Sequence, residues 1–276
     1  MRPTLLIALS ILCLATAGCE DTDVGMAIDA GKDAVQAATL SDEDVQRLAL
    51  EVARRSDQKH SVAPPDNPYA RRLQRLVGRA RRHGGHTFNY KVYLSPTVNA
   101  FAMADGTIRI YSGLMDIMDD RELLFVIGHE MGHVAEKHIR KKIILAYTGR
   151  AVRKAIASQR NEAGQIARSG VGALAEKLVN AQFSQQEERE ADDYGVLFLK
   201  ANGFDKRPAI AAMLKLAAAG HQHSFLSSHP APEARAERLR ASDYAPRKVE
   251  GPSVLERLWA RIKDLWPFGR NASDPG

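Results

Sequence analysis

The sequence contains very little cysteine. Cys13 and Cys19 are the two cysteines among 276 residues, and both lie close to the N-terminus. Cys13 falls in a segment that we expect to be removed, so the mature chain would keep one cysteine and form no internal disulfide. Because no thiolate then remains in the folded part, any metal site has to be built from histidine and carboxylate side chains.

Long hydrophobic runs are also missing. A membrane-spanning helix needs about 20 apolar residues, and the apolar run at 5–14 is about half that length. It follows Met1-Arg2 and precedes small residues, which is the layout of a secretory signal. The small residues stand directly before Cys19, as at the sites where bacterial lipoproteins are cleaved and acylated. We therefore expect a lipoprotein signal peptide at 1–18 and a lipid on Cys19, the alternative being an ordinary secretory signal with an incidental cysteine.

Neither sign of charge dominates, since the sequence contains 39 Lys and Arg residues and 33 Asp and Glu residues. Arginines gather in the segment 71–82, where they alternate with apolar residues at helical spacing. An amphipathic helix with a solvated basic face explains this pattern, although such a face can also bind nucleic acid or anionic lipid. No nucleic-acid-binding motif accompanies the arginines, so we expect no nucleic-acid partner.

The chain divides into segments of different character. Residues 19–40 are small, acidic and aperiodic, which predicts a flexible tether. We expect a folded domain at 41–245, opening with a helix whose start is marked by Ser41-x-x-Asp44. The last segment, 246–276, is predicted to be an extension with an amphipathic helix containing two tryptophans, which lies in a membrane interface or packs on protein.

The folded segment mixes two periodicities. Alternating apolar residues in 88–94 and two short runs around Asp105-Gly106 predict a small antiparallel sheet with a hairpin. Asp119 and Glu122 then form the signature of a capping box that opens a buried helix. From there to about residue 219 the pattern is helical. The sequence therefore predicts an α+β fold that is predominantly helical.

The helix after Asp119 carries His129-Glu130-Met131-Gly132-His133. Residues four apart project from one face of a helix, so His129 and His133 can hold one cation between their imidazoles. Glu130 is offset by one position, which suits a general base beside the metal in hydrolysis. The alternative is a pair of hydrogen-bonded core histidines. On a continuous helix His138 points to the opposite side, so we interpret it as a surface histidine.

A catalytic zinc ion takes three protein ligands and leaves one position open. Glu188 and Asp192 are four apart at the start of another helical run. If Glu188 binds zinc, Asp192 lies one turn later, where it can accept the free ring N–H of a liganding histidine. From charge alone, a solvated acidic turn is the simpler interpretation of this segment.

A family resemblance favours the metal site. The His129–His133 motif followed by Glu188-Arg189-Glu190-Ala191-Asp192 resembles the gluzincin-like metallopeptidase family that contains the membrane protease HtpX, the CaaX prenyl protease and the mitochondrial protease Oma. The likeness spans Ser41 to Arg240 and includes "NAFAMADGTIRIYSGLM" and "SSHPAPEARAERL". Within the family, "NYKVY", "GHEMGHVA" and "FSQ" are most similar to the LoiP-type outer-membrane lipoprotein metalloproteases.

The resemblance implies a zincin-like domain with one zinc ion, Glu188 as the third ligand and Glu130 as the catalytic base. It implies that His229 approaches the metal, either filling the open position in a latent state or stabilising the oxyanion. It further implies an edge strand that binds an extended peptide. The residues of that strand are Asn99, Ala100, Phe101 and Ala102.

The same resemblance implies a zinc endopeptidase that degrades misfolded or unassembled envelope proteins. Its place would be the periplasmic face of the outer membrane, attached through the lipid on Cys19, with the inner membrane as the alternative. The same grounds suggest an envelope protease or an outer-membrane assembly machine as a partner. A different class of function is a chaperone or assembly factor with a latent or structural metal. Unlike HtpX and the prenyl protease, this chain is expected to have no transmembrane helix, because its apolar runs are too short.

Overall fold

The computed structural model describes residues 23–78, 80–158, 182–220 and 224–242. The predicted signal peptide at 1–18, the lipidation site Cys19 and the C-terminal extension at 246–276 lie outside the described residues. Within the described ranges we find no helix with the length and apolar character that crossing a membrane requires.

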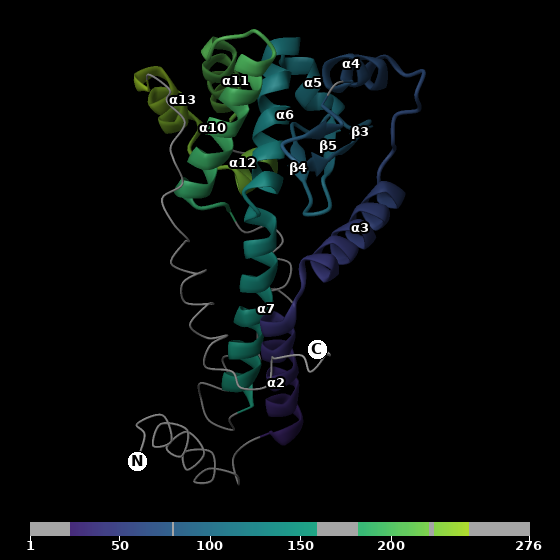
Figure 1. Ribbon diagram of the computed structural model, residues 1–276, viewed down its shortest axis with the longest axis vertical. Coiled ribbons are helices and arrows are strands. Elements are labelled where there is room, and N and C mark those ends of the chain that lie inside the picture. Colours follow the sequence, from purple (N-terminus) through teal and green to yellow (C-terminus); the bar gives the residue numbers. More distant parts are fainter. Residues whose placement is uncertain (1–22, 79, 159–181, 221–223, 243–276) are drawn as a thin grey trace, which may run out of the picture. The chain divides into compact units, whose positions relative to one another are not determined.

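Two helices lie side by side at the centre of the domain, α6 (Asp120–Ala135) and α10 (Gln185–Ala201) (Figure 1). The predicted capping box of α6 is present, with Asp119 accepting from the backbone of the first turn and Glu122 accepting from the Asp119 N–H. Every residue of α6 from Glu122 to Val134 is buried. A helix that is buried all round can place polar side chains in a water-poor interior.

Small residues allow α6 and α10 to approach closely. A Cβ atom added at Gly132 would lie 2.9 Å from the Cβ of Tyr194 and 3.0 Å from the Cα of Ala191. One turn earlier, a Cβ added at Gly128 would lie 3.0 Å from the Cα of Gly195. The close approach brings the first turns of α10 against the histidine face of α6.

A three-stranded sheet packs against α6, in the strand order β3 (Asn89–Tyr93), β5 (Thr107–Tyr111), β4 (Ala100–Ala102). The predicted hairpin at Asp105-Gly106 is confirmed, because β4 and β5 are antiparallel and Gly106 adopts a positive φ of 84°. The pairing of β3 with β5 is parallel, so the sheet is mixed instead of purely antiparallel. All five residues of β5 are buried, which explains why β5 takes the middle position and separates β3 from β4.

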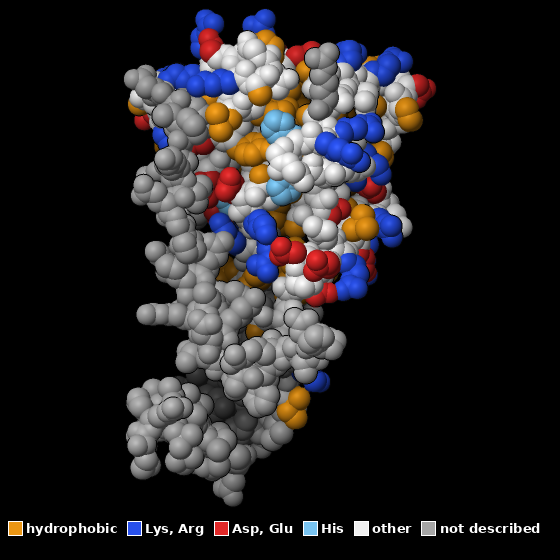
Figure 2. All heavy atoms as spheres, viewed as in Figure 1, with side chains coloured by type: hydrophobic (Ala, Val, Ile, Leu, Met, Phe, Trp, Pro, Cys, Tyr) orange, Lys and Arg blue, Asp and Glu red, His pale blue; other side chains and the backbone are white. Residues whose placement is uncertain are grey.

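The remaining elements complete the described fold. The helix predicted over the arginine-rich segment ends at Val77, before Arg82 enters a short strand. The other elements are α3 (Asp42–Lys59), α4 (Pro68–Val77), β1 (Arg82–His83), β2 (His86–Thr87), α5 (Ser112–Ile117), α7 (His138–Ala157), α11 (Arg207–Ala218), α12 (Ser224–Ser228) and α13 (Pro232–Ala241). Lys and Arg side chains intermingle with Asp and Glu on the face of the molecule drawn in Figure 2.

The segment predicted to be a flexible tether contains a helix, α2 (Val24–Thr39), so this expectation was wrong for 24–39. Asp23 caps α2 by accepting from the Met26 N–H, and α2 packs along α7. The buried Asp33 of α2 pairs with Lys154 of α7 at 2.8 Å. Composition suggested a flexible segment because the partner that stabilises α2 lies more than a hundred residues away in the sequence.

Candidate metal centre

Four buried side chains from three elements direct their polar atoms to one point. They are His129 and His133 of α6, Glu188 of α10, and His229 directly after α12, and one atom from each lies within 4.8 Å of all the others. The Nε2 atoms of His129 and His133 are 3.1 Å apart, as the spacing of four residues on a helix predicts. The Oε1 atom of Glu188 lies 3.6 Å from Nε2 of His133.

His229 completes this group. Its Nδ1 atom lies 3.2 Å from Nε2 of His129 and 2.9 Å from Oε1 of Glu188. Its ring stacks on Phe225 with centroids 4.4 Å apart, which fixes the ring plane. The tertiary structure therefore brings together the three predicted ligands and the histidine that the family resemblance singled out.

The donor set fits a small divalent cation. In a tetrahedral zinc site with metal–ligand bonds of 2.0–2.1 Å, neighbouring ligand atoms are about 3.3 Å apart. Five separations between these side chains, from 2.9 to 3.7 Å, lie around that value. Ring nitrogens that face each other at 3.1 Å repel unless a proton or a cation lies between them. Three imidazoles and one carboxylate at such distances are typical of a metal site.

Glu130 lies beside this group without joining it. Its carboxylate accepts a hydrogen bond from the backbone N–H of Ala102, on β4, and its Oε1 atom is 3.5 Å from Nε2 of His229. Among the described residues, Oε1 of Glu130 is buried and has no hydrogen-bond partner. A buried carboxylate oxygen of this kind is available to a water molecule or a substrate N–H.

Asp192 holds His129 from the opposite side, as predicted. Its Oδ1 atom lies 3.1 Å from Nδ1 of His129, and both side chains are fully buried. Because an ionised carboxylate can only accept, Nδ1 of His129 carries the proton and Nε2 keeps its lone pair for a metal.

Arg235 of α13 is a site residue that the sequence analysis did not identify. Its guanidinium donates two hydrogen bonds to Asp192, and its Nη1 atom also contacts Oε2 of Glu188. A signal existed in the sequence: Arg235 and Leu239 are four apart on α13, so a helix that buries Leu239 also buries Arg235.

His138 is fully buried, so its assignment as a surface histidine was wrong. The prediction assumed one continuous helix, but α6 ends at Ala135 and Lys137 has a left-handed φ of 56°. The chain turns there, and α7 begins at His138. Its Nδ1 atom lies 3.0 Å from Nδ1 of His133.

Burial governs the protonation of the group. It lowers the pKa of His129 to about 4 and holds the pKa of His133 and His229 well below the usual value. Burial, reinforced by Glu188, raises the pKa of Glu130 to about 8, and burial also raises that of Glu188. Three neutral imidazoles keep their lone pairs free for a cation, whose positive charge would favour the ionised form of both carboxylates.

Asp192 and Arg235 form the permanent charges next to this group. Burial raises the pKa of Asp192, but Arg235 and His129 outweigh it and hold that pKa well below the usual range. Burial likewise disfavours the charged form of Arg235, yet Asp192 and Glu188 keep its pKa above the ordinary value. The two charges therefore stay paired beside the neutral imidazoles.

The predicted peptide-binding residues Asn99, Ala100, Phe101 and Ala102 lie in and directly before β4. In the described sheet β4 is an edge strand, paired with β5 along one side. Ala100 is fully buried and Phe101 is half-buried. The strand lies against α6, and its Ala102 N–H reaches Glu130.

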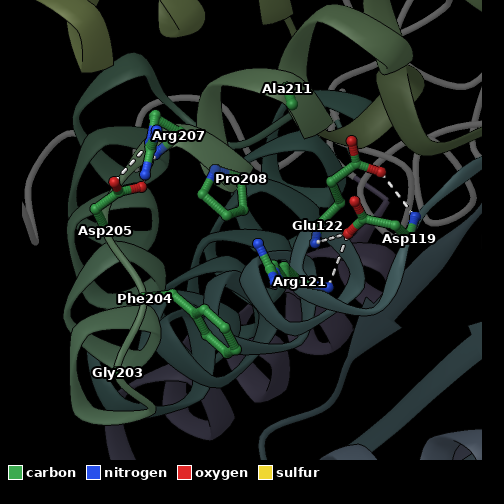
Figure 3. Close-up of a pocket in the computed structure, with 9 residues that line it drawn as sticks. All are labelled: Asp119, Arg121, Glu122, Gly203, Phe204, Asp205, Arg207, Pro208 and Ala211. Atoms are coloured by element: carbon green, nitrogen blue, oxygen red, sulfur yellow. Dashed lines mark hydrogen bonds and ion pairs between the residues drawn. The ribbon is translucent and has the colours of Figure 1, made fainter.

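A pocket of about 690 Å³ lies at the opposite end of α6, around its opening turn. Figure 3 shows Arg121, Phe204 and Asp205 lining it, with Arg207 directed at Asp205. Arg121 lies over the Phe204 ring at 5.2 Å. None of the predicted site residues lines this pocket.

The fold and the site define a metallopeptidase, and comparison with known proteins identifies the family. Residues 65–243 match the model of peptidase family M48, and the chain belongs to this family. It is therefore a metalloprotease, a hydrolase of peptide bonds, as the sequence motifs predict.

Two relatives cover most of the chain. The metalloprotease LoiP of Escherichia coli (strain K12) is 43% identical over 239 residues, which are 86% of this chain and 94% of that protein. The metalloprotease YcaL of the same organism is 38% identical over 242 residues, 86% of this chain and 95% of that protein. The beta-barrel assembly-enhancing protease of Escherichia coli (strain K12) is 28% identical over 198 residues, 67% of this chain and 40% of that protein. The predicted likeness to the LoiP-type proteases is confirmed.

Proposed function

We propose that the chain is a zinc endopeptidase whose ion is held by His129, His133 and Glu188. The observation that supports this most is the spacing of the ligand atoms, which lie 3.1 to 3.7 Å apart, close to the separations of a tetrahedral zinc site. When bound, the ion would supply Lewis-acid polarisation of the scissile carbonyl and a lowered pKa for water.

The residues of the chain supply the remaining chemistry. Glu130 takes a proton from water at its unpartnered Oε1 atom and returns it to the leaving amine. Asp192 and Arg235 hold His129 in the tautomer whose Nε2 atom is free. An extended peptide adds to the free side of β4 next to Glu130, so that Asn99, Ala100, Phe101 and Ala102 bind the backbone with little sequence preference.

His229 is proposed to hold the protein in a latent state in the described arrangement. Its Nδ1 atom lies where a fourth ligand belongs, 3.2 Å from His129 and 2.9 Å from Glu188. A catalytic zinc needs that position for water or substrate. We expect His229→Ala to raise the basal rate of cleavage. A lower rate would instead support the other role considered for His229, stabilisation of the oxyanion.

The experiment that tests the function combines metal analysis with proteolysis. Purified full-length protein should contain one zinc per chain and cleave casein, and a chelator should abolish cleavage until zinc is restored. Glu130→Gln should keep the zinc and lose cleavage, because the amide cannot accept the proton. Protein without a bound divalent metal, or full activity of Glu130→Gln, would contradict the proposal.

The cellular role is inferred from the N-terminal segment and the family. We propose that Cys19 is acylated and anchors the protease to the periplasmic face of the outer membrane, where misfolded or unassembled proteins are its substrates. Mass spectrometry of the mature N-terminus and membrane fractionation of Cys19→Ala test the anchor. Release of the Cys19→Ala variant into the soluble fraction is expected, and its retention would contradict a lipid anchor.

The second candidate function is assistance in assembly, with the metal structural or the site closed by His229. It is favoured by the 28% identity to a protease named for enhancing beta-barrel assembly. Complementation of a strain that lacks this protein separates the two functions. A Glu130→Gln variant should complement if assembly assistance is the main role, and should fail if proteolysis is.

A further inference from the structure

The carboxylate of Glu190 is connected to the candidate ligand His133 by hydrogen bonds through His138. Nε2 of His138 lies 2.8 Å from Oε2 of Glu190, and Nδ1 of His138 lies 3.0 Å from Nδ1 of His133. Both histidine rings are fully buried, while the Glu190 side chain is about one-third exposed. The three side chains form a continuous line from the surface of α10 to the face of α6 that holds the ligands.

The hydrogen-bond chemistry of this line fixes the direction of every bond. An ionised Glu190 can only accept, so Nε2 of His138 must carry a proton. A neutral His138 therefore presents a lone pair at Nδ1. One proton has to lie between the two facing Nδ1 atoms, and it must then belong to His133. The consequence is a His133 ring whose Nε2 atom is unprotonated and directed at the group formed by His129 and Glu188.

We propose that Glu190 and His138 are positioning residues that fix the tautomer and ring orientation of His133, so that its Nε2 atom can bind the metal. They do for His133 what Asp192 does for His129, with one ring inserted between carboxylate and ligand. Neither residue belongs to the group His129, His133, Glu188 and His229, and His138 contacts that group through the His133 ring. The inference rests on the proposed metal site.

The geometry around His138 supports a positioning role over simple core filling. Lys137, immediately before His138, adopts a left-handed φ of 56°, which a lysine rarely does. That turn is what directs the His138 ring back toward His133 instead of away from α6. A face of the His133 ring is stacked on Phe183 with centroids 3.7 Å apart, while its Nδ1 edge meets His138, so the ring is held from two directions.

The test measures zinc affinity of the full-length protein by competition with a chelating indicator, together with the visible spectrum of the cobalt-substituted protein. His138→Leu removes the acceptor for His133, and we expect about 10- to 100-fold weaker zinc binding and altered cobalt bands. His138→Gln keeps an acceptor and a donor on one side chain, and should bind zinc within about threefold of the unchanged protein. Glu190→Leu should weaken binding by about three- to tenfold.

A double variant shows whether Glu190 acts through His138. His138→Leu combined with Glu190→Leu should bind zinc no more weakly than His138→Leu alone, because Glu190 is then no longer connected to His133 by hydrogen bonds. His60→Leu is the matched control, since it removes a hydrogen-bonded histidine elsewhere in the fold, and should leave zinc affinity unchanged. Thermal melting of the metal-free proteins reports whether each variant folds.

The outcomes separate this inference from the proposed function. If the unchanged protein binds no zinc, both are wrong. If it binds zinc and both His138→Leu and Glu190→Leu keep the same affinity, the positioning role alone is wrong. Equal losses in His138→Leu and His138→Gln would also overturn it, because hydrogen bonding would then not be the property that matters. Should His138→Leu fail to fold, Glu190→Leu and His138→Gln still decide the question.

Discussion

Arg235 binds Asp192 through two parallel hydrogen bonds, from Nη2 to Oδ1 at 2.6 Å and from Nε to Oδ2 at 3.0 Å. The same guanidinium contacts Glu188, so one side chain orients both the third ligand candidate and the carboxylate behind His129. All four groups are buried. The chemistry of α6 therefore depends on a residue of α13 that lies about a hundred positions later in the chain.

Replacement of Arg235 by lysine should impair the metal site. A lysine ammonium cannot make the two parallel hydrogen bonds or reach both carboxylates in a fixed plane. We expect Arg235→Lys to weaken zinc binding by about 10- to 100-fold and to lower peptidase activity by at least as much. Indicator competition and casein cleavage measure the two effects. Arg240→Lys, at an exposed position of the same helix, is the control. Wild-type zinc affinity in Arg235→Lys would mean that a positive charge at this position is sufficient to support the metal site, without the two parallel hydrogen bonds.

Replacement of Gly132 by alanine should separate α6 from α10. The added methyl group would lie 3.0 Å from the backbone Cα of Ala191, so the helices must shift. We expect a loss of about 1–3 kcal/mol in the free energy of unfolding, together with weaker zinc binding because Glu188 moves with α10. Gly31→Ala on α2 meets nothing within 4 Å and should be neutral or stabilising by up to about 1 kcal/mol. Denaturant unfolding of both variants tests the comparison. An unchanged free energy of unfolding in Gly132→Ala would show that the contact between α6 and α10 tolerates a methyl group.

The turn at Lys137 should tolerate glycine and reject a β-branched residue. Its φ of 56° is open to glycine but strained for valine. We expect Lys137→Gly to keep stability and zinc affinity, and Lys137→Val to lose about 1–2 kcal/mol and to bind zinc less tightly as His138 is displaced. Lys141→Val, in the regular part of α7, should cost about 0.5 kcal/mol. Thermal melts and zinc titrations provide the measurements; equal behaviour of the two valine variants would argue against strain at this turn.

A cluster around Asp57, remote from the metal centre, should make stability depend on acid pH. Burial raises the pKa of Asp57, but hydrogen bonds from Arg109, Lys91 and Tyr93 outweigh it and hold that pKa well below the usual value of 3.8. A carboxyl whose pKa is lowered by folding stabilises the protein above its unfolded pKa, and this contribution is lost as pH falls below 3.8.

The variant Asp57→Asn removes that contribution. It should cost about 2 kcal/mol at pH 7, allowing for solvent screening of Asp57, because it leaves the buried Arg109 short of a charged partner. The difference between variant and unchanged protein should shrink as the pH falls below about 4. Denaturant unfolding at pH 7 and pH 3 measures it, with the exposed Asp66→Asn as control. A difference that stays constant with pH would mean that the ionised form of Asp57 is not what stabilises the cluster.

The sequence by itself determined whatever depends on neighbours within a few residues. The spacing of His129 and His133 sets their common face, the Asp119 and Glu122 side chains set the start of α6, and Asp105-Gly106 sets the hairpin. These follow from the geometry of one helical turn or one tight turn, which is the same in every protein.

The tertiary structure decided the contacts between segments distant in the chain. It placed Arg235 on Asp192, turned His138 back onto His133, made the pairing of β3 parallel, and gave α2 a partner in α7. No local periodicity encodes these contacts, because each depends on which elements meet across the core and how closely small residues allow them to approach. The histidine pair was therefore readable from local spacing, whereas Glu188 needed the family resemblance, and the contacts of Arg235 and His138 needed the tertiary structure.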